Sequence, residues 1–121
     1  MNIVIVGKRS RELDNLHAML ESITFIQSIE SISQISDAIK YVDTHPYSVV
    51  FVDYRDPNSN MDNEIAKLIL DHDCGHLVLL ETWNGPHKQF THYSTSGLVL
   101  NDLSVGVLRN FLNNVYECRL A

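Results

Sequence analysis

The clearest strand in the sequence is Ser48-Val49-Val50-Phe51-Val52, and Asp53 closes it. The segment is short, continuously apolar after its serine, and rich in β-branched residues. Such a run is typical of a strand buried on both faces, as in a parallel sheet that helices cover on each side. Two further runs have the same character, namely Ile3-Val4-Ile5-Val6, which stops at Gly7, and Leu77-Val78-Leu79-Leu80. Together these runs predict the interior of one parallel sheet.

Amphipathic segments separate the apolar runs and predict helices. In the first of them Leu13, Leu16 and Leu20 recur at helical spacing, and Ser10 is a suitable N-cap. Helices are predicted over residues 10–22, 36–44, 61–72 and 103–118. The last one carries an apolar stripe of Leu103, Val107, Leu108, Phe111, Leu112 and Val115. Weaker strands are expected over 24–30 and 98–100, and a short irregular helix over 87–95.

Strands and helices therefore alternate along the chain, which predicts an α/β fold with a parallel sheet and helices on both faces. The length of 121 residues suits one domain, and neither a linker nor an internal repeat interrupts the sequence. We expect residues 1–121 to form a single domain.

The composition favours an acidic cytoplasmic protein. The chain has 9 basic and 15 acidic residues, so its formal net charge is −6. Without clustered positive charge it is a poor direct binder of nucleic acid. No apolar run approaches the ~18 residues that span a membrane, and the N-terminus lacks the basic leader and cleavage site of a signal peptide. Cys74 and Cys118 form no C-x-x-C pair, which favours reduced thiols.

Polar residues follow four of the predicted strands at the point where each strand ends. They are Gly7-Lys8, Asp53, Glu81-Thr82 and Asn101-Asp102. In an open parallel sheet the carboxyl ends of the strands meet at one edge, where ligands and functional groups collect. We expect these residues to share one site.

The sequence around Asp53 resembles the centre of the receiver domain of response regulators. In that family a helix ends near a proline, a hydrophobic strand ends in the phosphoacceptor aspartate, and another proline follows four residues later. The matching residues are Asp37-Ala38-Ile39, His45-Pro46, Asp53 and Pro57. The segment 97–102 resembles the fifth-strand motif of receivers that precede helix-turn-helix output domains.

The resemblance covers nearly the whole chain. It implies a flavodoxin-like, doubly wound (βα)5 fold with five parallel strands in the order 2-1-3-4-5. It also implies a role as the N-terminal domain of a longer transcription regulator or signalling protein.

The chain departs from the receiver pattern at most of the family's site positions. Receivers place two acidic residues after the first strand to hold magnesium, and here Gly7 and Lys8 stand there. Glu81, with Thr82 beside it, replaces the Thr or Ser after the fourth strand, and Asn101 replaces the Lys after the fifth. Magnesium needs oxygen ligands, which glycine and lysine side chains do not offer. We therefore expect no metal and no cofactor.

The lysine after the first strand suggests a substitute for the metal. We expect Lys8 to place its ammonium beside Asp53 as an internal ion pair. The alternative is that Lys8 points to solvent while Asp53 accepts hydrogen bonds from local backbone amides.

Aromatic residues suggest an interaction surface. In receivers the face made by the fourth helix, fifth strand and fifth helix is the usual dimer or partner surface. The candidates here are Trp83, Phe90, Tyr93 and Tyr116. Exposed aromatics are typical interface anchors, although Trp83 and Phe90 also suit the cover of an irregular core region. We expect a protein partner and a homodimer through this face.

Other chemistry receives little support. His72, Cys74 and His76 have a spacing that suits zinc on one helix, but Gly75 and the following strand favour a turn instead. No nucleophile elbow or P-loop is present, so we expect no enzyme activity.

The leading interpretation is a phosphorylation-independent, receiver-like regulatory domain that binds proteins. The alternatives are a working phosphoacceptor at Asp53 and a sensor of a small anion or nucleotide beside Lys8 and Arg9.

Overall fold

The computed structural model of the chain describes residues 1–45, 47–55, 59–70, 76–82 and 95–120. The elements, in chain order, are β1 (Asn2–Val6), α1 (Arg11–Glu21), β2 (Ser28–Ile32), α2 (Ile35–Thr44), β3 (Val49–Asp53), α3 (Ser59–Leu70), β4 (His76–Glu81), β5 (Thr95–Val99), the 3-10 helix η1 (Leu100–Asp102) and α4 (Val105–Leu120). Nearly all of the helix predicted over 87–95 lies outside the described residues, and Thr95 begins a strand.

The five strands form one all-parallel sheet in the order β2-β1-β3-β4-β5. The predicted α/β class and strand order are therefore confirmed. In this register Val6 lies beside Val52, and Asp53 lies beside Leu80. The ends of the central strands consequently reach the same edge of the sheet.

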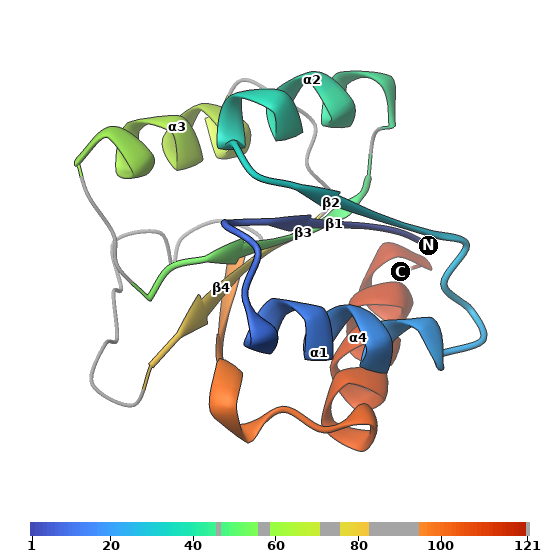
Figure 1. The fold of residues 1–121 in the computed structure, drawn as a ribbon. Helices are drawn as coiled ribbons and strands as arrows, with labels where there is room; N and C mark the ends of the chain where they lie inside the picture. Colours follow the sequence, from blue (N-terminus) through green and yellow to red (C-terminus); the bar gives the residue numbers. More distant parts are fainter. Residues whose placement is uncertain (46, 56–58, 71–75, 83–94, 121) are drawn as a thin grey trace.

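The side chains of the central strands alternate between two cores. Ile5 and Phe51 belong to the core beneath α1 and α4, whereas Val50 and Val52 belong to the core beneath α2 and α3. Figure 1 shows these two helix pairs on opposite faces of the sheet. The continuous apolar runs arise because both faces of these strands are buried. By the same alternation Asp53, two residues after Phe51, belongs to the α1 face.

Helix α1 begins where the sequence predicts. The hydroxyl of Ser10 accepts a hydrogen bond from the Leu13 amide at 3.2 Å, so the expected N-cap is confirmed. Such a cap stabilises a helix start by about 1 kcal/mol. It also fixes the position of Ser10 and Glu12 at the beginning of the helix.

Three predicted details are wrong. Strand β2 covers Ser28–Ile32 rather than 24–30, because it is an edge strand whose polar residues face solvent and weaken its apolar signal. Strand β5 covers Thr95–Val99 rather than 98–100. It contains Gly97, over which the Glu81 carboxylate lies. Val107 is 45% exposed instead of buried, because the buried face of α4 is the one that carries Leu108, Leu112 and Val115. No helix in the described residues is long and apolar enough to cross a bilayer.

Candidate functional site

The side of the sheet on which successive strands are added reverses between β1 and β3. Strand β2 lies on one side of β1, and β3, β4 and β5 follow on the other side. Open α/β sheets bind ligands at such a switch point, outside the carboxyl ends of the strands. A pocket of about 540 Å³ lies there, lined by Val6, Gly7, Lys8, Ser33, Gln34, Ile35, Val52, Asp53, Arg55, Asn60, Met61 and Glu64.

The Asp53 carboxylate is held on both oxygens by Arg55. The Nε atom of Arg55 donates to Oδ1 at 2.8 Å, and Nη2 donates to Oδ2 at 2.8 Å. The Arg55 backbone amide also donates to Oδ1 at 3.2 Å. This bidentate, charge-assisted arrangement is the strong form of an arginine–carboxylate pair. It engages both oxygens of the aspartate at the end of β3.

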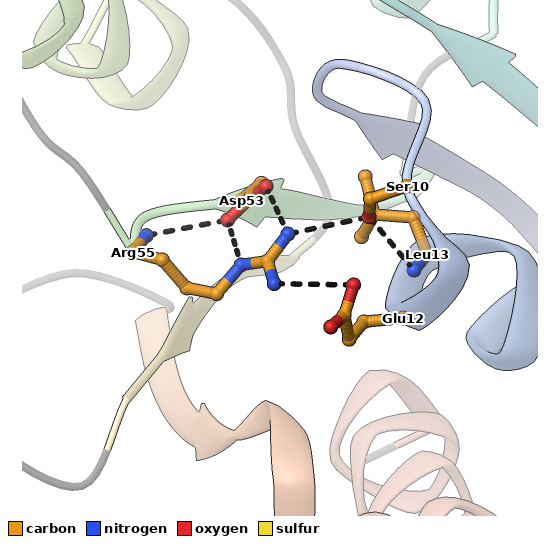
Figure 2. A network of polar contacts seen from close by, with 5 residues as sticks. All are labelled: Ser10, Glu12, Leu13, Asp53 and Arg55. Atoms are coloured by element: carbon orange, nitrogen blue, oxygen red, sulfur yellow. Dashed lines mark hydrogen bonds and ion pairs between the residues drawn. The ribbon is translucent and has the colours of Figure 1, made fainter.

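The same guanidinium reaches the start of α1. Its Nη2 atom lies 3.3 Å from the Ser10 hydroxyl, and its Nη1 atom lies 3.5 Å from Oε2 of Glu12. Figure 2 shows the Arg55 side chain between Asp53 on one side and Ser10 and Glu12 on the other. The arginine thus ties the end of β3 to the first turn of α1.

The pair is largely withdrawn from solvent. The Asp53 side chain is 17% exposed and that of Arg55 is 26% exposed. The hydrogen bonds and the charge of Asp53, with a smaller contribution from Glu12, raise the pKa of Arg55 above its usual value. The pKa of Glu12 is lowered, first by a hydrogen bond from its own backbone amide and then by Arg55. An acidic residue in the first turn of a helix is also favoured by the helix dipole.

A glycine allows Asp53 to lie this close to β1. A Cβ atom at Gly7 would lie 2.8 Å from Cβ of Asp53 and 2.9 Å from Cδ1 of Leu13. The Gly7 amide donates to the Ile32 carbonyl at 2.9 Å, which fixes its backbone. A side chain therefore does not fit at this position without displacing the aspartate or the helix.

The expected ion pair between Lys8 and Asp53 is wrong. Lys8 is exposed, although it lines the same pocket as Asp53. Arg55 takes its place because it follows Asp53 by only two residues, just after the strand ends, so its backbone amide and its guanidinium both donate to that carboxylate. The alternative geometry, with Lys8 at the surface and a local amide donating to Asp53, agrees with the structure. Arg9 lines a separate pocket and lies 3.7 Å from Asp14.

Sequence reasoning missed the two residues that complete the site. Arg55 and Glu12 gave no motif, because neither ends a strand. A signal was nevertheless present in the spacing Asp53-x-Arg55, since a basic residue two positions after a carboxylate is close enough in the chain to pair with it. Glu12 has no comparable signal, because only the tertiary structure brings α1 to the end of β3.

The remaining candidate site residues do not line this pocket. Glu81 ends β4, where its carboxylate lies over Gly97, and Thr82 follows it at the surface. Asn101 is exposed in η1. The structure thus brings together Gly7, Lys8 and Asp53, while the other predicted members lie nearer to β4 and β5.

The aromatic and histidine candidates divide in a similar way. Trp83, Phe90, Tyr93, His72 and Cys74 lie outside the described residues. Tyr116 is 48% exposed on α4. His76 begins β4 instead of ending a helix, and its Nε2 atom lies 2.9 Å from the Ser96 hydroxyl. Across the described ranges, no three His, Cys, Asp or Glu side chains are grouped to hold a metal ion.

The receiver-type magnesium site does not fit the residues present. The end of β1 offers the hydrogen of Gly7 and the ammonium of Lys8, and the Asp53 oxygens accept from a guanidinium. A hard divalent cation needs several free oxygen ligands.

Comparison of the chain with protein-family models, with curated proteins and with solved structures gives no significant match.

Proposed function

We propose that this chain is a receiver-like regulatory domain of the flavodoxin-like (βα)5 type that acts without phosphorylation, by binding other proteins in the cytoplasm. The observation that carries the proposal is the bidentate contact of Arg55 with Asp53. The strand order and the aspartate at the end of β3 support the receiver resemblance. The surroundings of that aspartate argue against phosphoryl chemistry.

Lone pairs on both oxygens of the Asp53 carboxylate are already engaged. Phosphoryl transfer to Asp53 requires one oxygen to attack and a cation to offset the repulsion between anions. Both oxygens accept charge-assisted hydrogen bonds from Arg55, and the end of β1 supplies no acidic ligand for a metal. The arginine therefore stabilises the unmodified carboxylate and leaves the phosphorylation reaction unassisted.

Binding through a protein surface is a means of signalling that needs no phosphorylation. Strand β5 is an edge strand, and the adjoining α4 exposes the aromatic ring of Tyr116. Aromatic side chains of this kind anchor interfaces. We propose that this face binds a protein partner, with a second copy of the chain as the first candidate, and that an output domain follows in a longer regulator.

The test is mass spectrometry of the protein after incubation with acetyl phosphate and magnesium. We expect the intact mass to remain unchanged in the wild type, as in the Asp53→Asn variant. A gain of one phosphoryl group in the wild type alone would instead support the working phosphoacceptor and overturn this proposal.

The pocket at the switch point favours a second candidate function, the binding of a small anion or nucleotide. Its volume of about 540 Å³ suits a small ligand, and the exposed Lys8 is one of the residues that line it. Thermal-shift measurements with inorganic phosphate and with nucleotides test this function, because a ligand of the folded state raises Tm by mass action. Loss of that shift in Lys8→Ala, but not in Lys67→Ala, would assign the ligand to this pocket.

A further inference from the structure

We propose that Arg55 is a built-in counter-cation, and that it is the residue that excludes divalent metal ions from Asp53. This inference deepens the proposed function and rests on it, because it assigns to a side chain the charge that a metal brings in phosphorylated receivers. Three features of the site support it: the oxygen atoms around the guanidinium, the charges of the cluster and the short tether between Arg55 and Asp53.

The guanidinium lies among oxygen atoms of the kind that hard cations take. Its Nη2 atom is 2.8 Å from Asp53 Oδ2 and 3.3 Å from the Ser10 hydroxyl oxygen. Its Nη1 atom is 3.5 Å from Glu12 Oε2. Carboxylate and hydroxyl oxygens bind magnesium, manganese and calcium, with water completing the shell. With Arg55 removed, the oxygens of Asp53, Ser10 and Glu12 surround the position that the guanidinium leaves, where a hydrated ion can contact them directly or through water.

The Ser10 hydroxyl is suited to contact either the Arg55 guanidinium or a metal ion. Its oxygen already accepts a hydrogen bond from the Leu13 amide, which caps α1. A hydroxyl oxygen has a second lone pair, and that lone pair faces Arg55 in this structure. A metal ion would use the same lone pair, so the cap of the helix is compatible with both arrangements.

The charges of the cluster explain why loss of Arg55 favours a divalent ion. The two carboxylates of Asp53 and Glu12 carry two negative charges, and the guanidinium offsets one of them. The other charged groups that line the pocket are Lys8 and Glu64, of opposite sign. Loss of Arg55 therefore leaves a partly buried carboxylate without its cation, beside a second carboxylate. This is a setting in which a divalent ion gains affinity.

The tether gives the arginine its advantage over a free ion. Arg55 is two residues from Asp53, so its guanidinium is always present at the site, and its planar fork matches the carboxylate. A divalent ion from solution must displace two charge-assisted hydrogen bonds and lose part of its hydration shell. Magnesium in particular dehydrates reluctantly.

The experiment measures manganese and magnesium binding to Arg55→Met, which keeps the length of the side chain but removes its charge and donors. We expect this variant to bind Mn²⁺ at least about tenfold more tightly than the wild type, by calorimetry and by a rise in Tm at constant ionic strength. Arg11→Met, which removes an exposed charge from the same helix start, controls for net charge and should behave as the wild type. Adding Asp53→Asn to Arg55→Met should abolish the gain.

Two results would overturn the inference. One is an Arg55→Met or Arg55→Gln variant that folds and binds Mn²⁺ no better than the wild type. The other comes from the wild type alone, so it does not depend on the folding of a variant: selective broadening by Mn²⁺ of the amide signals of Ser10 and Asp53 would show that Arg55 does not exclude the ion. Phosphorylation of the wild type by acetyl phosphate is a separate outcome, which bears on the proposed function and not on metal exclusion.

Discussion

Arg55 and Asp53 are joined through both carboxylate oxygens, with Nε to Oδ1 and Nη2 to Oδ2 each at 2.8 Å. The pair closes the end of β3, and the remaining nitrogen of the guanidinium extends to Glu12 of α1. The strand that decides the fold therefore ends in a carboxylate whose charge is offset by Arg55. This relationship accounts for the chemistry proposed for the site and leads to several measurable consequences.

The first prediction concerns the free energy of unfolding. Arg55→Met should destabilise the protein by about 1–3 kcal/mol, because it leaves a mostly buried carboxylate without its charged donors. Urea unfolding measures this, with Arg11→Met expected to lie within about 0.5 kcal/mol of the wild type. In a double-mutant cycle with Asp53→Asn the two effects should not add, since the residues contact each other. Additive effects would contradict a direct pair.

The second prediction uses two glycines that differ in the space around them. Gly7→Ala should destabilise the fold by about 1–3 kcal/mol, because its Cβ would lie 2.8 Å from Cβ of Asp53. Gly106→Ala in α4 is the matched control. There the new Cβ meets only the Ser104 hydroxyl, at 3.9 Å, so higher helix propensity should stabilise the protein by about 0.5–1 kcal/mol. Equal effects of the two substitutions would show that Gly7 does not contact Asp53 closely.

The third prediction concerns the pH dependence of stability. The pKa of Glu12 is lowered in the folded state from its usual 4.5, so the unfolded chain binds more protons as the pH falls below that value. The stabilising contribution of Glu12 is therefore complete above pH 4.5 and is lost as the pH falls through the folded pKa. Glu12→Gln should flatten the stability curve in this acidic window only.

The backbone hydrogen bond and the Arg55 charge, which both lower the pKa of Glu12, can be separated in a variant that lacks Arg55. An NMR titration of the Glu12 carboxyl in Arg55→Met should show its pKa move upward, because the attraction of the guanidinium is gone. The pKa should nevertheless stay below 4.5, because the backbone hydrogen bond is the larger cause. An unchanged pKa in the variant would mean that Arg55 does not act on Glu12.

The fourth prediction concerns assembly. If a second copy of the chain binds the face of β5 and α4, Tyr116→Ala should shift the protein toward monomer in size-exclusion chromatography with light scattering. Tyr47→Ala removes another exposed aromatic, just before β3, and should leave the mass unchanged. A wild type that is monomeric at all concentrations tested would rule out the homodimer and leave a different protein as the partner.

The patterns of the sequence determined the fold class and the central strands, whereas the strand order was implied by the resemblance to receiver domains. Runs such as Val49-Val50-Phe51-Val52 predict strands covered on both faces, and Ser10 marks a helix start, because burial and capping are written in the local order of residues. These signals have periods of two or about four residues, so they survive without knowledge of distant contacts. They weaken at the edges of the sheet, where β2 and β5 are partly polar and the predicted bounds were wrong.

Only the tertiary structure decided which cation reaches Asp53. Lys8 and Arg55 both come near the end of a strand, and the sequence favoured Lys8 because it stands where receivers hold their metal ligands. The direction of each side chain settles the matter: Arg55 shares the side of Asp53 and reaches the first turn of α1, whereas Lys8 is exposed. Asp53 and Arg55 are only two residues apart, but the contact of Arg55 with Glu12 and the position of Lys8 depend on distances of a few ångströms between segments that are remote in the chain. Such distances are fixed by packing and not by the pattern of any one segment.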